Sequence, residues 1–450
     1  MKLNRSAVAA VAAVASLLAL TSCSSLPKFG GEKKEAATAE QRAGRVTMVL
    51  DNSRIEPSAT LTGIAIELPA PVSVNAWTEA GSNAAKLPSH VEAAPKLRVA
   101  WRRSIGKGST KTAAITTPPV TSATTIFTMD AAQTVRASSL SNGGELWSQR
   151  LKGVSKRDKS ALGGGLAVAG DTLVVASGYG YVAALDAGTG AQKWRRELGS
   201  PITGSPTISE GRIFVASNNN EVFSLNLATG EIAWSDQAIS ESARVLGSSS
   251  AAAVEDFVIA PFSSGEIIAY LAANGRRLWT DALAQSGRFT PISEINDIGS
   301  RPVLGAGLVF VSSQSGTTAA IDGRTGARVW TAPVGSTKAP ALTGRFLFVL
   351  GTNDELAALD ASTGEAYWVK QLTSFRDEKK KKKPISYSAP IVASGRVIVV
   401  SSRGDLLAFS PEDGSQTASL KLGETVYIEP IATQGRLYVL TDKGKLIAID

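Results

Sequence analysis

The chain has 450 residues, of which 43% are hydrophobic and 19% are charged, and its formal net charge is +8. This composition is typical of a globular protein with a large buried core, and the mild positive excess suits either solubility alone or contact with an anionic surface or an acidic partner. A single Cys and a single His exclude a disulfide within the chain, and they argue against a Cys/His metal site or a Cys–His catalytic pair.

The first segment, residues 1–22, predicts a signal peptide. Two basic residues precede an apolar run from Ala7 to Leu20, which is too short for a comfortable membrane span. The tetrapeptide Leu20-Thr21-Ser22-Cys23 resembles the bacterial lipobox. That resemblance implies cleavage before Cys23 and acylation of the new terminus, palmitate included, as a membrane anchor. Ser24 stands where the inner-membrane retention signal has Asp, so the resemblance implies the periplasmic face of the outer membrane.

The second segment, residues 23–95, is predicted to be a lipidated tether and linker. Ser24–Gln41 is rich in Ser, Lys, Glu, Ala and Gly, a composition typical of disorder. Several prolines interrupt the remainder and disfavour regular elements there. The only histidine, His90, falls in this linker.

From residue 96 onward the sequence repeats. Leu185–Trp194 reads Leu-Asp-Ala-Gly-Thr-Gly-Ala-Gln-Lys-Trp, and near-copies occur at Leu225–Trp234, Ile321–Trp330 and Leu359–Trp368. Short β-branched runs and Gly, Asp or Asn turns separate them, which is the pattern of short buried strands. The positions equivalent to the motif Asp are Leu140, Asp186, Asn226, Leu271, Asp322, Asp360, Ser410 and Asp450.

The spacing of these positions predicts the fold. The intervals run from 38 residues (322 to 360) to 51 residues (271 to 322), which is the size of a four-stranded propeller blade. Eight units predict an all-β, eight-bladed β-propeller over residues 96–450. The last unit stops at Asp450 without a fourth strand, and Leu97–Trp101 resembles an orphan fourth strand. We therefore expect the N-terminal strand to complete the last blade and hide both terminal edges.

The repeated motif is interpreted as structural. Its Asp carboxylate can accept backbone N–H groups across the turn, and its Gly can adopt a positive φ. Its Trp is expected to pack between neighbouring blades while the indole N–H finds an acceptor. The alternative is a surface on which the Trp rings stack with sugars or bases, but regular repetition favours packing.

The unit Leu-Asp-x-x-Thr-Gly-x-x-x-Trp resembles the pyrroloquinoline-quinone (PQQ)-type propeller repeat. Two branches share this repeat, the quinoprotein dehydrogenases and the BamB family of lipoproteins in the outer-membrane β-barrel assembly (BAM) machine. Asn75–Trp77 and Pro88–His90 resemble the lead-in of quinoprotein-type propellers, which implies a segment lying against the propeller. The enzyme branch implies a vicinal disulfide, a calcium site and an Asp base. One Cys cannot form that disulfide, and no local acidic cluster stands out, so we expect no cofactor and no catalytic residue.

The BamB resemblance implies binding of the BamA POTRA domains and other BAM subunits through loops between blades. Residues 242–248 and 293–302 resemble two such family loops. We expect Ile295 and Ile298 to be exposed apolar anchors inside a polar rim, and strand addition to contribute to binding. The alternative is that both Ile side chains tuck into the blade below. The candidate partner-binding residues are Arg244, Val245, Leu246, Glu294, Ile295, Asp297, Ile298 and Arg301.

Five consecutive lysines, Lys379–Lys383, interrupt the repeats. They predict a solvated loop, and contact with anionic lipid or an acidic partner is the functional alternative.

The sequence as a whole predicts a non-enzymatic scaffold lipoprotein of the BAM complex. The alternatives are a PQQ-dependent dehydrogenase and a periplasmic scaffold of another envelope complex, for example one tied to cell-wall polymers. Contact with unfolded barrel precursors is left open, and nucleic acid is not an expected partner of an exported lipoprotein.

Overall fold

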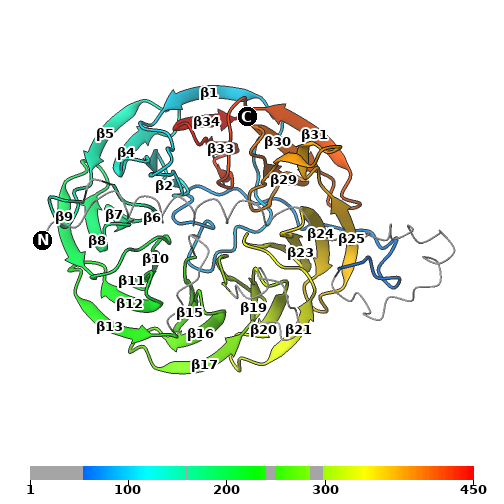
Figure 1. Cartoon of the computed structure of the whole chain (residues 1–450), viewed down its shortest axis with the longest axis horizontal. Coiled ribbons are helices and arrows are strands. Elements are labelled where there is room, and N and C mark those ends of the chain that lie inside the picture. The colour runs from blue at the N-terminus through cyan, green and yellow to red at the C-terminus, as the bar shows by residue number, and fades with distance from the viewer. Residues whose placement is uncertain (1–53, 159, 240–248, 284–296) are drawn as a thin grey trace, which may run out of the picture. The chain divides into compact units, whose positions relative to one another are not determined.

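The computed structural model describes residues 54–158, 160–239, 249–283 and 297–450. Within these ranges the chain forms strands and turns without a helix. Eight four-stranded antiparallel sheets form a closed ring and are the blades of a propeller (Figure 1). The predicted all-β, eight-bladed architecture is confirmed.

Seven blades are continuous in the sequence, and their strands pair in chain order. The first strand lies nearest the axis and the fourth is outermost (Figure 1). Blades 1 to 4 consist of β2 (Val120–Thr121), β3 (Thr125–Met129), β4 (Thr134–Ser139) and β5 (Glu145–Arg150); β6 (Gly164–Ala169), β7 (Thr172–Ser177), β8 (Tyr181–Asp186) and β9 (Gln192–Glu197); β10 (Thr207–Ser209), β11 (Arg212–Ala216), β12 (Glu221–Asn226) and β13 (Ile232–Gln237); and β14 (Ala252–Val254), β15 (Phe257–Pro261), β16 (Glu266–Leu271) and β17 (Arg277–Ala282).

Blades 5 to 7 repeat the arrangement, and a two-stranded hairpin is inserted before blade 7. Their strands are β18 (Val303–Gly305), β19 (Leu308–Ser312), β20 (Thr318–Asp322) and β21 (Arg328–Ala332); β22 (Ala341–Thr343), β23 (Phe346–Leu350), β24 (Glu355–Asp360) and β25 (Ala366–Gln371); the hairpin β26 (Phe375–Asp377) and β27 (Lys382–Pro384); and β28 (Ile391–Ala393), β29 (Arg396–Val400), β30 (Asp405–Phe409) and β31 (Gln416–Lys421).

The burial of each strand follows its place in the blade. All five residues of β23 are buried, and its sequence Phe-Leu-Phe-Val-Leu is apolar throughout. The outermost β9 reads Gln-Lys-Trp-Arg-Arg-Glu, and none of its residues is fully buried. Inner strands are covered on both faces by neighbouring blades and therefore need continuous apolar runs, whereas outer strands meet solvent.

Blade 8 joins the two ends of the propeller. It contains β32 (Ile431–Thr433), β33 (Arg436–Leu440), β34 (Lys445–Ile449) and β1 (Val99–Ser104), in the sheet order β1-β34-β33-β32. The first strand β1 pairs antiparallel with β34, with Trp101 opposite Ala448 and Arg103 opposite Leu446. The first and last strands of the fold are thus paired in one sheet, in which β34 is internal and β1 is the outermost strand.

Seven of the eight interfaces between blades contain the same clasp. In each clasp a Trp on the fourth strand donates its indole N–H to a carbonyl in the third turn of the next blade, and the turn glycine, at positive φ, lies against the Trp ring. The packing role predicted for the motif Trp is therefore confirmed. The donor–acceptor pairs are Trp101–Ser141, Trp147–Ala187, Trp194–Leu227, Trp234–Ala272, Trp279–Gly323, Trp330–Ala361 and Trp368–Pro411, with N···O distances of 2.7–3.0 Å.

The motif Asp orders the turn that receives the Trp. The Asp186 carboxylate accepts hydrogen bonds from the Gly188 and Thr189 backbone N–H groups at 3.1 and 2.9 Å, and from the Thr189 hydroxyl at 2.8 Å. Asp322 and Thr325 make the same contacts. Since these bonds fix the turn carbonyl, the Asp acts on the clasp and not on a ligand.

The eighth interface, between blades 7 and 8, has no clasp. Ala418 stands opposite Ala408, in the register where the other blades place Trp, and blade 8 has chain ends in place of the turn. Residues 54–95, which we name the lead-in segment, cross this interface. The Ala94 backbone N–H donates to Gly435 O of blade 8 at 2.8 Å, and the Arg396 guanidinium of blade 7 donates to Ala94 O at 2.8 Å.

The lead-in segment also crosses the axis and touches the innermost strands of the other blades (Figure 1). Trp77 is 2% exposed, and the His90 ring bonds to Pro69 O and to the Gly395 backbone N–H. The second half of the predicted linker is therefore part of the propeller. Backbone bonds to inner strands join Trp77 to Thr121, Thr78 to Val168, Ala84 to Ala253, Ala85 to Leu304, Val91 to Val392 and Val74 to Gln434.

Candidate binding surface

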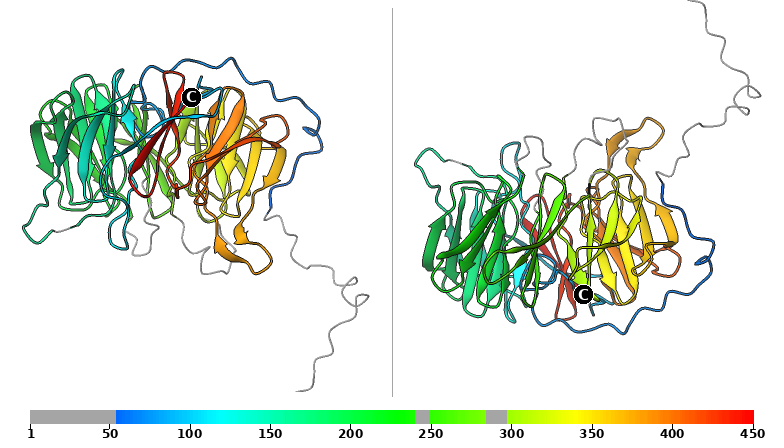
Figure 2. Two further views of the ribbon diagram at one scale, coloured as in Figure 1. Left: turned by 90° about the horizontal axis from the view of Figure 1, so that it is seen from above. Right: turned by 90° about the horizontal axis from the view of Figure 1, so that it is seen from below.

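The two faces of the propeller differ in what covers them. The lead-in segment meets the turns between first and second strands, such as Gly435 after β32. Each first strand begins at the opposite end, where the connector from the preceding blade enters it. We name the face formed by these connectors the connector face. Figure 2 shows the β26–β27 hairpin projecting on the side opposite the lead-in segment. Variable loops thus gather on the connector face.

The predicted partner-binding loops are both connectors. Arg244, Val245 and Leu246 precede β14, and Glu294 and Ile295 precede β18; all five lie outside the described residues. The connector between Ala282 and Val303 is much longer than the connector between Ala332 and Ala341. Connectors of unequal length are where a repeat protein can present a specific surface.

Ile298 is not an exposed anchor, so that expectation is wrong. Its side chain is 0% exposed and belongs to a buried cluster with Leu283 and Ile267 of blade 4 and Val309 of blade 5. Its backbone N–H donates to Phe262 O at 3.4 Å. The apolar side chain is drawn between two blades because the connector must return to the axis there, which shields it from water.

Asp297 also departs from the expected polar rim. It is 4% exposed, and its carbonyl accepts the Gln314 backbone N–H at 3.1 Å. Asp297 and Ile298 together hold the end of the connector against blade 5.

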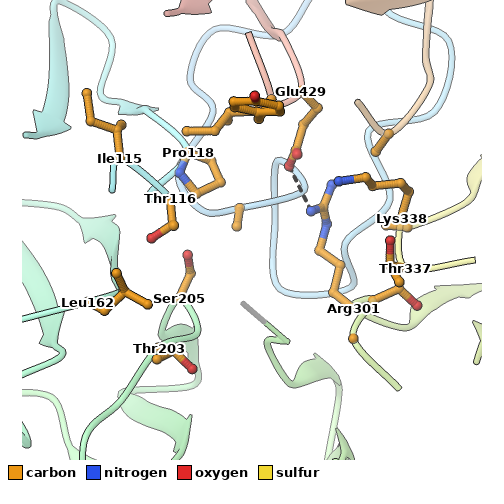
Figure 3. A pocket seen from close by; sticks show the side chains of 18 residues that line it. Ile115, Thr116, Pro118, Leu162, Thr203, Ser205, Arg301, Thr337, Lys338 and Glu429 are labelled. Carbon is orange, nitrogen blue, oxygen red and sulfur yellow. Dashed lines mark ion pairs between the residues drawn. The ribbon is translucent and has the colours of Figure 1, made fainter. Parts of the chain in front are cut away.

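Arg301 points toward the propeller axis and not toward a loop rim. Its guanidinium pairs with the Glu429 carboxylate at 2.7 Å, and both side chains are 15% exposed. The two residues come from the connectors into blades 5 and 8, on different sides of the ring. They face a shared cavity (Figure 3).

This axial cavity has a volume of about 270 Å³. Residues from seven connectors line it, and Ala80 of the lead-in segment closes it on the side away from the connectors. Hydroxyl groups of Thr116, Thr203 and Ser205 lie across the cavity from Arg301 and Lys338 (Figure 3). A polar cavity of this size holds on the order of nine water molecules, or a small ligand.

Lys338 is the third charged residue of the cavity. Burial lowers the pKa of its ammonium group, although the Glu429 carboxylate acts in the opposite direction. For Glu429, burial favours the neutral acid, but the charges of Arg301 and Lys338 outweigh it and hold the pKa below its usual value. Glu429 is therefore a carboxylate at neutral pH, and it is shared between two cations.

A second ion pair lies at the closed end. The Lys86 ammonium and the Glu79 carboxylate of the lead-in segment are 2.6 Å apart and almost fully buried. Gly81, at φ +82°, lies against Arg301, because a Cβ there would come within 2.7 Å of Nε. The lead-in segment thus forms the floor beneath Arg301.

The lysine hairpin is ordered at its base and exposed at its tip. The Arg376 guanidinium donates to Ser402 O at 2.9 Å, and the Lys380 N–H donates to the Asp377 carboxylate at 3.1 Å. All five lysines are exposed. These contacts are compatible with a solvated turn and with contact to an anionic surface.

The remaining chemistry of the described residues is limited. They contain no group of three His, Cys, Asp or Glu side chains placed to hold a metal ion. Across the same ranges, no helix has the length and apolar character needed to cross a membrane.

Sequence reasoning missed the axial cluster, although a local signal exists. Arg301 and Glu429 each directly precede a Pro that opens a blade, and Lys338 lies two residues before such a Pro. First strands begin beside the axis, so side chains just before them face the centre of the ring. A charged residue at this position is therefore an axial residue.

The ring of eight clasped blades and its loop-rich face define a repeat-built β-propeller that presents a binding surface. The model of the family "Outer membrane protein assembly factor BamB" matches residues 98–370 and 374–450. The match covers the propeller almost completely. The chain belongs to the BamB family.

Curated relatives agree with this assignment. The outer membrane protein assembly factor BamB of Moranella endobia is 28% identical over 222 residues, which are 48% of this chain and 57% of that protein. BamB of Escherichia coli K12 is 25% identical over 240 residues, which are 53% of this chain and 61% of that protein. Each match spans less than two thirds of the relative's length.

Solved structures share the fold. BamB from Moraxella catarrhalis superposes with a TM-score of 0.67 at 19% identity, covering 78% of this chain and 99% of that one. A europium-containing methanol dehydrogenase gives a TM-score of 0.66 at 15% identity, covering 82% and 89%. At these identities the likeness concerns architecture alone, because one fold serves unrelated functions.

Proposed function

We propose that this protein is a non-enzymatic scaffold of outer-membrane β-barrel assembly. It is anchored to the outer membrane through acylated Cys23, faces the periplasm, and binds the POTRA domains of BamA with other BAM subunits. The observation that carries the proposal is the BamB family match across residues 98–370 and 374–450. The named function of the curated relatives, outer membrane protein assembly, agrees with it.

The connector face is the proposed partner surface. Its loops vary in length, whereas the opposite face is occupied by repeated turns and the lead-in segment. With Ile298 buried and Arg301 engaged at the axis, the proposed contact residues reduce to Arg244, Val245, Leu246, Glu294 and Ile295. A loop with apolar residues beside charges suits an interface with an apolar centre and a polar rim.

Co-purification from membranes tests this surface. The full chain, tagged at its C-terminus, is expected to capture BamA, and the double variant Arg244→Glu/Leu246→Asp is expected to lose most of that capture. Reversing a charge and placing a carboxylate in an apolar contact both oppose docking. The protein level and melting temperature should stay close to those of the unmodified chain.

Val154→Asp is the matched control. Val154 is 48% exposed on the connector into blade 2, so the change repeats the apolar-to-carboxylate half of the double variant on another loop of the same face. Undiminished capture by the double variant would reject the proposed surface. Equal loss in both variants would indicate a nonspecific effect of negative charge.

Membrane attachment is tested separately. Cys23→Ser should remove metabolic labelling by palmitate and release the chain from the outer-membrane fraction. Labelling that persists in this variant would contradict the anchor.

A further inference from the structure

The axial cavity has more positive than negative charge. Three basic residues, Arg301, Lys338 and Lys86, stand against two acidic residues, Glu429 and Glu79. Two ion pairs, at 2.7 and 2.6 Å, account for four of the five groups. The Lys338 ammonium has no hydrogen-bond or ion-pair partner among the residues that the structure describes. One cationic charge is therefore left over beside the cavity.

The wall opposite Lys338 is polar. Thr116, Thr203 and Ser205 lie across the cavity from Arg301 and Lys338 (Figure 3). Burial of a charge without a partner is costly, so a lone ammonium group beside a cavity favours an anionic ligand.

The combination fits one ligand chemistry. A small oxyanion supplies the charge that would balance Lys338 and oxygen atoms that accept hydrogen bonds from an ammonium group. The cavity is closed on one side by Ala80 of the lead-in segment and bounded by connectors from seven blades, so a bound anion would be held by parts of the chain far apart in sequence.

We propose that the axial cavity binds a small molecule with a carboxylate or phosphate group. Lys338 supplies the charge and the hydrogen-bond donor, and Arg301, paired with Glu429, adds a second cation on the same cavity wall. Glu429 keeps Arg301 in place through their ion pair. This site is independent of the partner surface on the loops.

The test uses the purified full chain in detergent micelles, with succinate, acetate and inorganic phosphate as probes. Sodium chloride at matched ionic strength is the reference, and succinamide is the uncharged analogue. We expect at least one probe class, the carboxylates or phosphate, to raise the melting temperature in a saturable way. Succinamide should leave the melting temperature unchanged. A ligand that binds only the folded chain must produce such a rise. A response to the carboxylates alone or to phosphate alone identifies the head group.

Two variants locate the site. Lys338→Met should abolish the anion-dependent rise, and its ligand-free melting temperature should match or exceed that of the unmodified chain, because a buried lone charge has been removed. Lys156→Met changes an exposed lysine of another connector and should leave binding unchanged.

Two outcomes would overturn the proposal. One is the absence of any saturable response to the three anions, which would make the cluster a device that only holds the connectors together. The other is an equal response in Lys338→Met and in the unmodified chain, which would place anion binding elsewhere.

Discussion

The two faces of this propeller are built from the same eight blades, yet they differ in regularity. The turn face contains the turns between the first and second strands, and the connector face contains the connectors between blades. On the turn side, seven Trp clasps repeat with one geometry, and the lead-in segment fills the centre. On the connector side, loop lengths vary, a lysine hairpin is inserted, and charged residues surround a cavity. Repetition on one side stabilises the ring, and the irregular side is free to bind.

The interface without a clasp supports this division. Between blades 7 and 8, Ala418 replaces the Trp, and lead-in residues Val91, Ala93 and Ala94 join a buried cluster with both blades. Among the described blades, the interface without a clasp is thus reinforced from the turn side. Substitutions there should change stability and leave partner capture intact, and the predictions below test this separation.

Removal of a clasp should have the largest effect. Trp330 is 8% exposed and its N–H bonds to Ala361 O at 2.9 Å. Trp330→Ala is expected to cost roughly 3–5 kcal/mol of the free energy of unfolding, as truncation of a buried aromatic does. Urea denaturation measures the loss. BamA capture below the transition should be retained, and a small stability change would argue against clasps as the main link between blades.

Two glycines of blade 3 allow the cost of backbone strain to be measured separately from the cost of disturbing a clasp. Gly230 (φ +71°) lies against the Trp194 ring, whereas Gly211 (φ +70°) has nothing within 4 Å of an added Cβ. Gly211→Ala should cost about 1–2 kcal/mol from the left-handed backbone alone. Gly230→Ala should cost about 1–3 kcal/mol more because the methyl group displaces the ring. Equal costs, measured by denaturant midpoints, would mean that the ring contact contributes nothing.

The lead-in segment should contribute less than a clasp. The Arg396 guanidinium donates to Ala93 O at 3.3 Å and to Ala94 O at 2.8 Å. Arg396→Met is expected to cost about 1.5–3 kcal/mol, the range for hydrogen bonds from a charged group. Hydrogen exchange should increase at residues 90–95 and in β28–β29.

The control for this change is Arg212→Met. Arg212 begins β11 as Arg396 begins β29, but its side chain makes no hydrogen bond to the described residues of the lead-in segment. We expect less than about 0.5 kcal/mol for this variant. Exchange that rises equally in both variants would show that the lead-in segment does not depend on Arg396.

Lowering the pH should have the smallest of these effects on stability, and it should act on the clasp turn that contains Asp360. Asp360 is 1% exposed; burial favours its neutral form, but hydrogen bonds from Ser362, Arg345 and Tyr367 outweigh it and hold the pKa at about 2. Because the folded pKa lies below the usual Asp value, the stabilisation is present above about pH 4 and is lost as pH falls toward 2. Asp360→Asn should flatten this part of the stability–pH curve by on the order of 1–2 kcal/mol. A curve with an unchanged slope would exclude Asp360 as its source.

The repeated part of the fold could be predicted from sequence because its interactions are local and periodic. The motif from Leu185 to Trp194 contains the Asp, Gly and Trp of the clasp, and its copies set the number of blades. The partial unit at Leu97–Trp101 also indicated where the ring begins. Each of these inferences depends on a pattern that recurs within a few tens of residues.

The axial and lead-in features could not be predicted in the same way. Val91 and Ala94 bind distant strands mainly through their backbones, which leaves no side-chain pattern. Ile298 has the same apolar character whether it is exposed on a loop or buried between blades, so sequence alone left both readings open. Arg301, Lys338 and Glu429 meet only after the ring closes, since they come from three different connectors.

Site-specific photo-crosslinking in intact cells tests the central claim most directly. A crosslinking amino acid is placed at Leu246, on the connector into β14, or at Val254, at the other end of β14 on the turn face and 42% exposed. We predict that the chain crosslinks to BamA from position 246 and not from position 254. Crosslinking to BamA from position 254 alone, or from neither position, would contradict a BAM scaffold that binds through its connector face.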